Sequence, residues 1–364
     1  MDHQRSLDSI IFLLGAGASV PLGMPTTDEL RKRLCDRTAL GELATELHRS
    51  AAYRFRIGED DVNIETLLEH LYELKLLVWL ARRSEVPSLL PALTSHTSKI
   101  AATADEKLAR VEARVFELVE QTCGDCDAPA AERLWRNLLN FVSRRQHRIP
   151  IFTLNYDWTF ERLAIQRPKR YELVDGYELL GGAWNPRRFS AVPVAGKVNI
   201  SLYKLHGSTN WVGEGPVKSI AKFADGAGFI MIPPGHAHEI SLGDEYWRQP
   251  SADDLAPPLL TAEPFKTLNL AFNKALRTAK TVVVIGYAFH DRQVNHQLEE
   301  ALAVNKHIRV LVVDPGTRYG RAPFEWLKFS LFKTDWSRFH WLQLRFEQRT
   351  TSEITKAIKV LEAG

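Results

Sequence analysis

A short, wholly apolar run that ends in a glycine-rich turn constrains the fold of this chain more than any other feature. Residues 9–14 read Ser-Ile-Ile-Phe-Leu-Leu, and Gly15-Ala-Gly17-Ala-Ser19 follows directly. Continuous rather than alternating apolar character is typical of a strand buried on both faces, as in a parallel sheet. Helical spacing begins only after Thr26 and Glu29, which stand in capping-box register. The order strand, glycine turn, helix indicates an α/β fold.

Five further runs rich in β-branched and aromatic residues predict strands at 149–154, 198–205, 229–232, 281–285 and 308–313. The last two enclose an amphipathic segment over 291–304, and together they form a β-α-β unit whose parallel pairing is nearly obligatory. We therefore expect an α/β protein with a Rossmann-like parallel sheet and helices on both faces.

Residues 28–148 read almost entirely as helix. Asn63 is placed to cap one helix, Thr103 and Glu106 have capping-box spacing for a second, Gly124 would end it, and Asp127 can cap a third. The chain is thus expected to divide into a Rossmann-like domain, an inserted all-helical subdomain and a C-terminal extension that packs on the core. The expected bounds are 1–27 with 149–325 for the domain, 28–148 for the insertion and 326–364 for the extension.

Composition narrows the class of protein. At roughly 100–200 residues per domain, 364 residues suggest about two structural units. Lys and Arg number 47 and Asp and Glu 44, so the net charge of +3 gives no reason to expect direct binding to nucleic acid or to a membrane surface. No run reaches the roughly 20 apolar residues of a membrane span, and no secretory signal pattern is present, so we expect a cytoplasmic protein.

The three cysteines do not indicate a metal site. Cys123 and Cys126 form a lone Cys-x-x-Cys that supplies at most half of a tetrahedral zinc site, and Cys35 stands far away in the sequence. We expect no bound metal.

Polar residues of the kinds used in catalysis follow the predicted strands. Gly15, Ala16, Gly17 and Ser19 stand where a glycine turn can cradle a pyrophosphate, although a tight turn without ligand would look the same. Asn155 and Asp157 follow the strand at 149–154, and Asp157 could equally be a helix cap.

Later strands repeat this arrangement. His206 follows the strand at 198–205 and could be a general base or a plain turn histidine. Gly286, Asp291 and Asn295 follow the strand at 281–285, and Asp314 follows the next, each with an alternative as cap or turn. In a parallel sheet these carboxyl ends would converge on one crevice.

Together these residues resemble the sirtuin family, and most closely the sirtuin-like domains of bacterial antiviral defence systems. Asp291 and Asn295 match the Gly-Tyr-Ser/Ala-Phe-x-Asp-x-x-x-Asn form of those domains. The resemblance is carried, in the family's order, by Gly15-Ala-Gly-Ala-Ser19 with Gly23-Met-Pro25 behind it, Thr153-Leu-Asn155-Tyr-Asp157, Lys204-Leu-His206-Gly-Ser208 and Gly286-Tyr-Ala-Phe289.

The resemblance implies an NAD hydrolase, with NAD as substrate and no metal. Protein deacylases of the family carry a four-cysteine zinc module after the His-Gly, and this chain has no cysteine beyond Cys126. Because nicotinamide leaves NAD as a good leaving group, an amide and a base suffice. Asn155 would orient the water and ribose hydroxyls, His206 would accept a proton, and Asp157 would hold the nicotinamide ribose. The cofactor-binding set would be Gly15, Ala16, Gly17, Ser19, Gly286, Asp291, Asn295 and Asp314.

Two other functions stay open, an NAD-dependent deacylase or ADP-ribosyl transferase and a non-catalytic module that binds NAD or ADP-ribose. A defence enzyme that depletes NAD in abortive infection must be silent until triggered. The resemblance therefore implies a trigger or partner, such as a HerA-type translocase ATPase, an Argonaute-like protein or a phage protein. We also expect a homo-oligomer, with the stripe Leu67, Leu71, Leu74 and Val78 of the helical insertion as its candidate surface.

Overall fold

The structure is a computed structural model of the 364-residue chain. It describes residues 10–36, 38–59, 62–83, 94–178, 181–214, 219–223, 230–231, 263–289, 291–316 and 336–363.

A seven-stranded sheet forms the centre of the molecule, and every neighbouring pair in it is parallel. The strands lie in the order β12-β11-β10-β1-β2-β5-β3. The expected Rossmann-like parallel sheet is thereby confirmed. The strands are β1 (Ile10–Leu14), β2 (Ile149–Thr153), β3 (Tyr171–Val174), β5 (Val198–Lys204), β10 (Thr281–Ile285), β11 (Arg309–Val313) and β12 (Phe339–Leu342).

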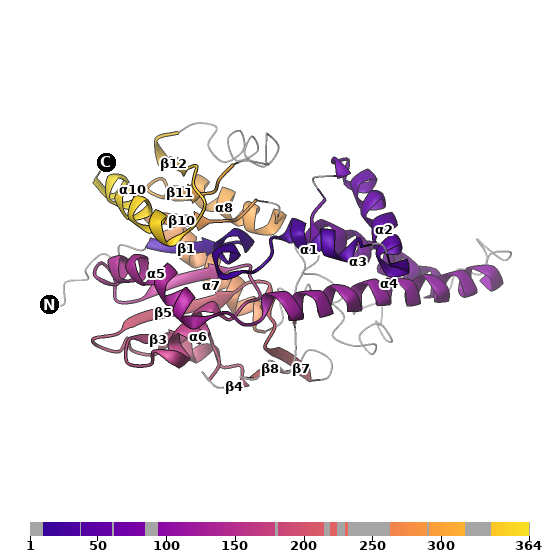
Figure 1. The fold of residues 1–364 in the computed structure, drawn as a ribbon, viewed down its shortest axis with the longest axis horizontal. Helices are drawn as coiled ribbons and strands as arrows, with labels where there is room; N and C mark the ends of the chain where they lie inside the picture. Colours follow the sequence, from indigo (N-terminus) through magenta and orange to yellow (C-terminus); the bar gives the residue numbers. More distant parts are fainter. Residues whose placement is uncertain are drawn as a thin grey trace.

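The apolar run of β1 is explained by burial on both faces. Ile11 and Leu13 belong to one hydrophobic core, whereas Ile10, Phe12 and Leu14 belong to another on the opposite face, as the two-residue period of a strand requires. Figure 1 shows helices on both sides of the sheet. The first core is covered by α7 (Phe265–Thr278) and α8 (Arg292–Val304), and the second by α5 (Ala128–Ser143), α6 (Thr159–Gln166) and α10 (Thr351–Ala363).

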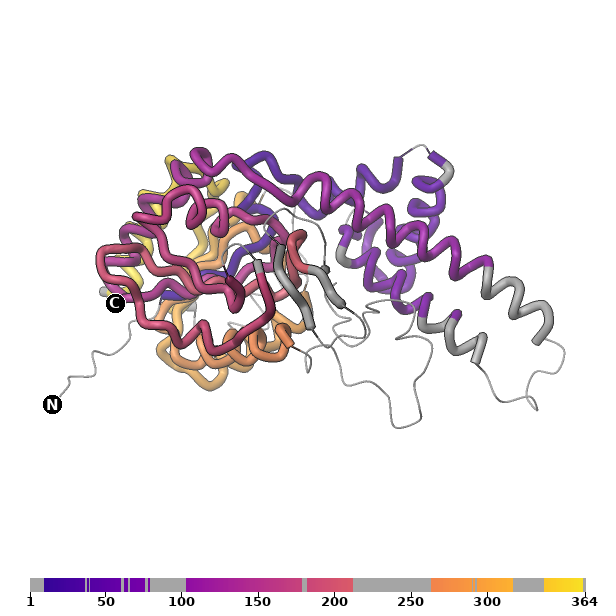
Figure 2. Tube along the Cα trace, turned by 90° about the horizontal axis from the view of Figure 1, so that it is seen from below, coloured from indigo at the N-terminus to yellow at the C-terminus, as the bar shows by residue number. Residues whose placement is uncertain are grey.

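Four helices form a second body with its own core. They are α1 (Thr27–Leu34), α2 (Ala39–Phe55), α3 (Ile64–Arg83) and α4 (Thr94–Cys123). This helical subdomain projects from one end of the α/β body, and α4 runs along its length back to the sheet (Figures 1 and 2). Of the helices that the structure describes, none combines the length and the apolar character that crossing a membrane requires.

The helix ends follow the expected signals in most cases. Thr26 and Glu29 form the capping box of α1, the Asn63 side chain accepts from the N–H of Thr66, and that of Asp127 accepts from the N–H of Ala130. The predicted helix start at Thr103 is wrong, because α4 runs unbroken from Thr94 to Cys123. A capping-box pattern is a local signal, and it also occurs inside helices.

Packing differs from the expected domain bounds at two points. Helix α5 was included in the insertion over 28–148, but Leu134, Trp135 and Leu138 pack in the core shared with the sheet. The helical subdomain therefore ends with α4. The segment over 326–364 was expected to be an extension, but β12 is the edge strand of the central sheet and α10 covers one face.

Two small antiparallel sheets lie outside the central one. One joins β4 (Gly181–Ala183), β8 (Ser219–Phe223) and β7 (Trp211–Glu214), and the other joins β6 (Gly207–Ser208) to β9 (Ile230–Met231). The strand predicted at 229–232 thus corresponds to β9, which takes no part in the parallel sheet.

The candidate assembly stripe on α3 packs inside the helical subdomain. Leu67 and Leu71 are fully buried in its core, and Leu74 packs against that core from its margin. Leu67 and Leu71 are already covered within the chain, so these two side chains do not form a subunit seam, whereas the expected homo-oligomer stays a prediction.

The order of the strands fixes where a ligand can enter. From β1 the chain moves to β2 on one side, whereas from β10 it moves to β11 on the other. Strands β1 and β10 are neighbours, so the loops that leave their carboxyl ends diverge and open a crevice. The glycine turn at Gly15 and the loop at Gly286 begin at this switch point.

Candidate functional site

A cavity of about 1020 Å³ lies at the switch point. Its walls come from the carboxyl ends of four strands, and the first turns of α1 close it on the side of the helical subdomain. Pockets for small molecules typically measure roughly 300–1000 Å³, so the cavity can hold a ligand of dinucleotide size. The expected site residues on its wall are Gly15, Ala16, Gly17, Ser19, Asn155, Asp157, Gly286 and Asp314.

Two glycine loops pack backbone against backbone at the floor of the cavity. The N–H of Gly15 donates to the carbonyl of Ile285, and that of Gly17 donates to the carbonyl of Gly286, each at 3.0 Å. A Cβ added to Gly15 would lie 2.6 Å from the carbonyl oxygen of Gly286. These glycines are therefore needed for loop packing. The N–H groups of Gly15 and Gly17, which were expected to bind a pyrophosphate, already donate to backbone carbonyls of the neighbouring loop.

We expect Gly286→Ala to lower the free energy of unfolding by about 2–4 kcal/mol. Gly286 has a φ of 61°, and an added Cβ would lie 2.4 Å from backbone atoms of Gly17 and Ala18. Gly196→Ala is the control, because Gly196 also has a positive φ of 78° but nothing lies within 4 Å of the added Cβ. Denaturant unfolding of both variants measures the difference, and equal losses would contradict the packing argument.

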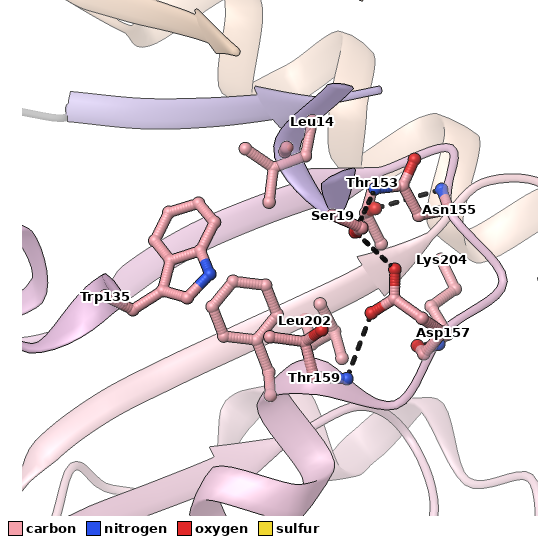
Figure 3. Close-up of a pocket in the computed structure, with 11 residues that line it drawn as sticks. Leu14, Ser19, Trp135, Thr153, Asn155, Asp157, Thr159, Leu202 and Lys204 are labelled. Atoms are coloured by element: carbon pink, nitrogen blue, oxygen red, sulfur yellow. Dashed lines mark hydrogen bonds between the residues drawn. The ribbon is translucent and has the colours of Figure 1, made fainter. Parts of the chain in front are cut away.

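Asn155 is held in one orientation by both hydrogens of its amide. Its Nδ2 donates to the carbonyl of Gly15 at 3.0 Å. It also donates to Oγ of Ser19 at 2.9 Å, as Figure 3 shows. Because both hydrogens are used, the amide cannot flip without losing two bonds. Oδ1 takes no hydrogen bond from the described residues, so Asn155 offers an acceptor on the cavity wall.

Asp157 acts as an internal support. Its Oδ2 accepts from Oγ of Ser19 at 2.6 Å, and its Oδ1 accepts from the N–H of Thr159 at the start of α6. The side chain is buried although it borders the cavity. Both oxygens are thus occupied within the protein. The N-cap of α6 is Trp158, without a side-chain cap, so Asp157 is not the helix cap that the sequence offered as an alternative. Through Ser19, Asp157 holds the amide of Asn155.

A second, much smaller pocket borders this network. Figure 3 shows Trp135 and Leu14 on its apolar side and Ser19, Asn155 and Asp157 on its polar side. Its volume is about 10 Å³, which is close to the space that one water molecule needs. It is too small for a substrate, so the large cavity is the candidate site.

Lys204 is a fully buried cation beneath the Asn155 loop. Its ammonium donates to the carbonyl of Asp157 and, at 3.5 Å, to that of Tyr156, and it lies 3.4 Å from a carboxylate oxygen of Glu161. Lys204 and Glu161 are 1% and 3% exposed. The sequence analysis did not predict this pair as part of the site. The pattern that could have indicated it is a lysine at the end of a buried strand, two residues before His206.

His206 and Asp291 form a buried pair. Nε2 of His206 lies 2.7 Å from Oδ2 of Asp291, and both residues are almost fully buried. Nδ1 of His206 is buried and has no hydrogen-bond partner in the described part of the chain. Neither residue is among the described residues that line the large cavity. His206 nevertheless lies close to Asn155 in the fold, because Thr153 and Lys204 pair in register and each residue follows its partner by two positions.

Asn295 organises the loop after β10. Its Nδ2 donates to the carbonyl of Phe289 at 2.7 Å, and its Oδ1 accepts from the Tyr287 hydroxyl at 2.9 Å. Phe289 has a φ of 59°, a conformation that needs such support in a residue other than glycine. Asn295 therefore supports this loop, and its expected contact with a cofactor stays a prediction.

Asp314 stands at the rim of the cavity just beyond β11. Burial raises the pKa of its carboxyl, while the N–H of Gly316 donates to Oδ1 and lowers it. One carboxylate oxygen thus fixes the turn, which leaves Oδ2 as the acceptor for a ligand hydroxyl. The cationic residues that line the cavity are Arg31, Lys32 and Arg345.

The helical subdomain contributes residues to the site. The sequence analysis did not predict this contribution. Residues 26–32, Asn63 and Cys123 line the cavity. Burial raises the pKa of Cys123 to about 11 and that of Cys126 to about 12, so both are thiols near neutral pH. Among the described residues, no cluster of three or more His, Cys, Asp or Glu side chains could hold a metal ion.

The family model of the SIR2-like domain matches residues 150–325, somewhat under half of the chain. This stretch contains Asn155, His206 and the loop that begins at Gly286, so the expected resemblance is confirmed at the level of a SIR2-like domain. The glycine turn at Gly15 lies outside it. No curated protein matches the chain.

Solved structures of Sir2 homologues match over nearly the whole chain with low similarity. A Sir2 homologue in complex with NAD is 12% identical, with a TM-score of 0.42 and coverage of 98% of this chain and 91% of that one. A mutant Sir2 homologue in complex with 2'-O-acetyl-ADP-ribose is 13% identical, with a TM-score of 0.41 and coverage of 99% and 97%. Similarity at this level carries no information about what this chain binds.

Proposed function

We propose, on the premise of a SIR2-like domain over residues 150–325, that the chain is an NAD glycohydrolase that releases nicotinamide and leaves ADP-ribose. The observation that carries the proposal is the locked amide of Asn155. Its Nδ2 is bound to Gly15 and Ser19, so Oδ1 is the atom that it offers at the wall of a dinucleotide-sized cavity.

The proposed reaction needs few groups. The bond between C1' of the ribose and the pyridine nitrogen breaks, its electron pair goes to that nitrogen, and neutral nicotinamide leaves without protonation. The oxygen of a water molecule forms the new bond to C1' and loses one proton. Asn155 Oδ1 would accept a hydrogen bond from this water or from a ribose hydroxyl, and His206 would accept the proton. Fixed dipoles around the oxocarbenium-like ribose would stabilise the transition state.

The cavity wall offers partners for the rest of NAD. The turn at Gly15–Gly17 lines the cavity, so a diphosphate can lie against its backbone, and Arg31 and Arg345 line the same cavity as cations. The carboxylate of Asp314 is placed to accept from the hydroxyls of the adenosine ribose, as acids after neighbouring strands do in dinucleotide sites.

We include a biological role in the proposal. An enzyme that destroys NAD in the cytoplasm would arrest its own cell, so it fits an antiviral response that is silent until triggered. A protein partner or a homo-oligomer would supply that control. The covered stripe on α3 does not serve as the contact, because Leu67 and Leu71 are buried within the subdomain.

The test is to incubate the purified chain with NAD and follow nicotinamide and ADP-ribose by chromatography, with and without a candidate partner. We expect His206→Ala to reduce nicotinamide release at least about 10²-fold, as the loss of a positioned base does. His307→Ala is the matched control, because His307 is exposed. Undiminished release by His206→Ala would contradict the assignment, and acyl-lysine turnover in place of hydrolysis would favour a deacylase.

A further inference from the structure

The two carboxylate oxygens of Asp291 accept hydrogen bonds from different partners. Oδ1 caps α8 by accepting from the N–H groups of Gln293 at 2.8 Å and Val294 at 3.0 Å. Oδ2 lies 2.7 Å from Nε2 of His206. The side chain is 2% exposed, so water does not compete for either oxygen.

This arrangement selects one tautomer of His206. A carboxylate can only accept hydrogen bonds, so the 2.7 Å contact requires a proton on Nε2. In the neutral imidazole the other nitrogen, Nδ1, then carries the lone pair. Nδ1 is buried and has no partner among the described residues, which is a costly arrangement unless another molecule uses the atom.

The loop that carries Asp291 is itself braced. The Tyr287 hydroxyl donates to the carbonyl of Asp291 at 3.2 Å and to Oδ1 of Asn295 at 2.9 Å. Gly286 at the start of the loop accepts from the N–H of Gly17. The carboxylate of Asp291 is therefore held by the first turn of α8, and its backbone is held by Tyr287.

We propose that Asp291 is a positioning residue that holds His206 as the Nε2–H tautomer and so presents Nδ1 as the proton acceptor. The inference rests on the proposed NAD hydrolysis and deepens it. It replaces the expected role of Asp291 as a contact for the cofactor.

The variant that tests this is Asp291→Asn. Asparagine caps helices as well as aspartate does, and its one carbonyl oxygen is claimed by the N–H groups of Gln293 and Val294. Its NH₂ group then faces Nε2 of His206 and donates, which moves the imidazole proton to Nδ1. We expect kcat for nicotinamide release to fall about 10²-fold or more, with KM changed less than about threefold.

The matched control is Asp127→Asn, which makes the same chemical change at the N-cap of α5. We expect unchanged kcat and KM for it. A similar loss of kcat in both variants, or a loss in Asp291→Asn that appears only in KM, would overturn the positioning role.

A second measurement does not depend on activity. Nitrogen-15 NMR of histidine side chains at alkaline pH reports the neutral tautomer, and the His206 signals are assigned by their loss in His206→Gln. We expect the Nε2–H tautomer in the wild type and the Nδ1–H tautomer in Asp291→Asn. The same tautomer in both proteins would overturn the inference even if NAD is hydrolysed. Absence of nicotinamide release with the expected tautomer change would instead overturn the proposed function.

Discussion

Replacing Asn155 with alanine is expected to reduce nicotinamide release at least about 100-fold. The variant removes Oδ1, the acceptor that we assign to the water or the ribose hydroxyl, and it removes the donor to Oγ of Ser19, which keeps its own bond to Asp157. The side chain is only partly buried, so the fold should survive. Steady-state kinetics with NAD and the thermal unfolding midpoint are the two measurements.

Asn305→Ala provides the control for this prediction. Asn305 also uses its Nδ2 to bridge two backbone carbonyls, those of Leu276 and Ala279, at a position away from the cavity. Each variant loses the two hydrogen bonds that Nδ2 donates, and Asn305→Ala also loses the bond from the N–H of His307 to Oδ1, so we expect the control to lose at least as much stability, on the order of 1–3 kcal/mol. Activity should fall only in the Asn155 variant. Equal loss of activity in both would show that the effect of Asn155 is structural.

The sequence could predict which strands of the fold are buried on both faces. The continuous apolar runs of β1 and β10 require cover on both faces, and the structure supplies it with the cores beneath α7 and α5. The sequence analysis did not predict strands β3 and β12. Tyr171–Val174 is followed by a segment rich in Gly and Pro, and Phe339–Leu342 is a four-residue edge strand, for which only pairing with a neighbour decides the conformation.

The sequence identified which residues belong to the candidate site more reliably than it identified what each of them does. Strand ends are visible in a sequence, so Asn155, His206 and Asp291 could be named. Their tasks depend on long-range contacts such as that between Ser19 and Asp157, which are 138 residues apart. No local pattern encodes such a contact. The wall built by α1 was missed for the same reason, because the packing of the helical subdomain against the sheet places it there.

Lys204→Met is expected to lower the free energy of unfolding by about 3–5 kcal/mol, the usual effect of removing one partner from a buried ion pair. Glu161 is 3% exposed, and neither of its carboxylate oxygens has a hydrogen-bond donor among the described residues. The ammonium of Lys204 is therefore the group that offsets its burial. The same variant removes the donor to the carbonyls of Tyr156 and Asp157, so the loop that presents Asn155 should also lose order and NAD turnover should fall.

Two further variants separate charge from packing, with the free energy of unfolding from urea denaturation as the measurement. Lys197→Met breaks an ion pair with Glu172 that is partly exposed, so we expect a loss of at most about 1 kcal/mol. The double variant Lys204→Met with Glu161→Met replaces the buried pair by apolar side chains, which is often neutral or stabilising, so most of the lost stability should return. Activity should stay low in the double variant, because methionine cannot donate to the two carbonyls beside Asn155. If Lys204→Met and Lys197→Met cost the same, the buried charge of Glu161 does not govern the stability of this site, and if the double variant regains full turnover, Lys204 does not hold the Asn155 loop.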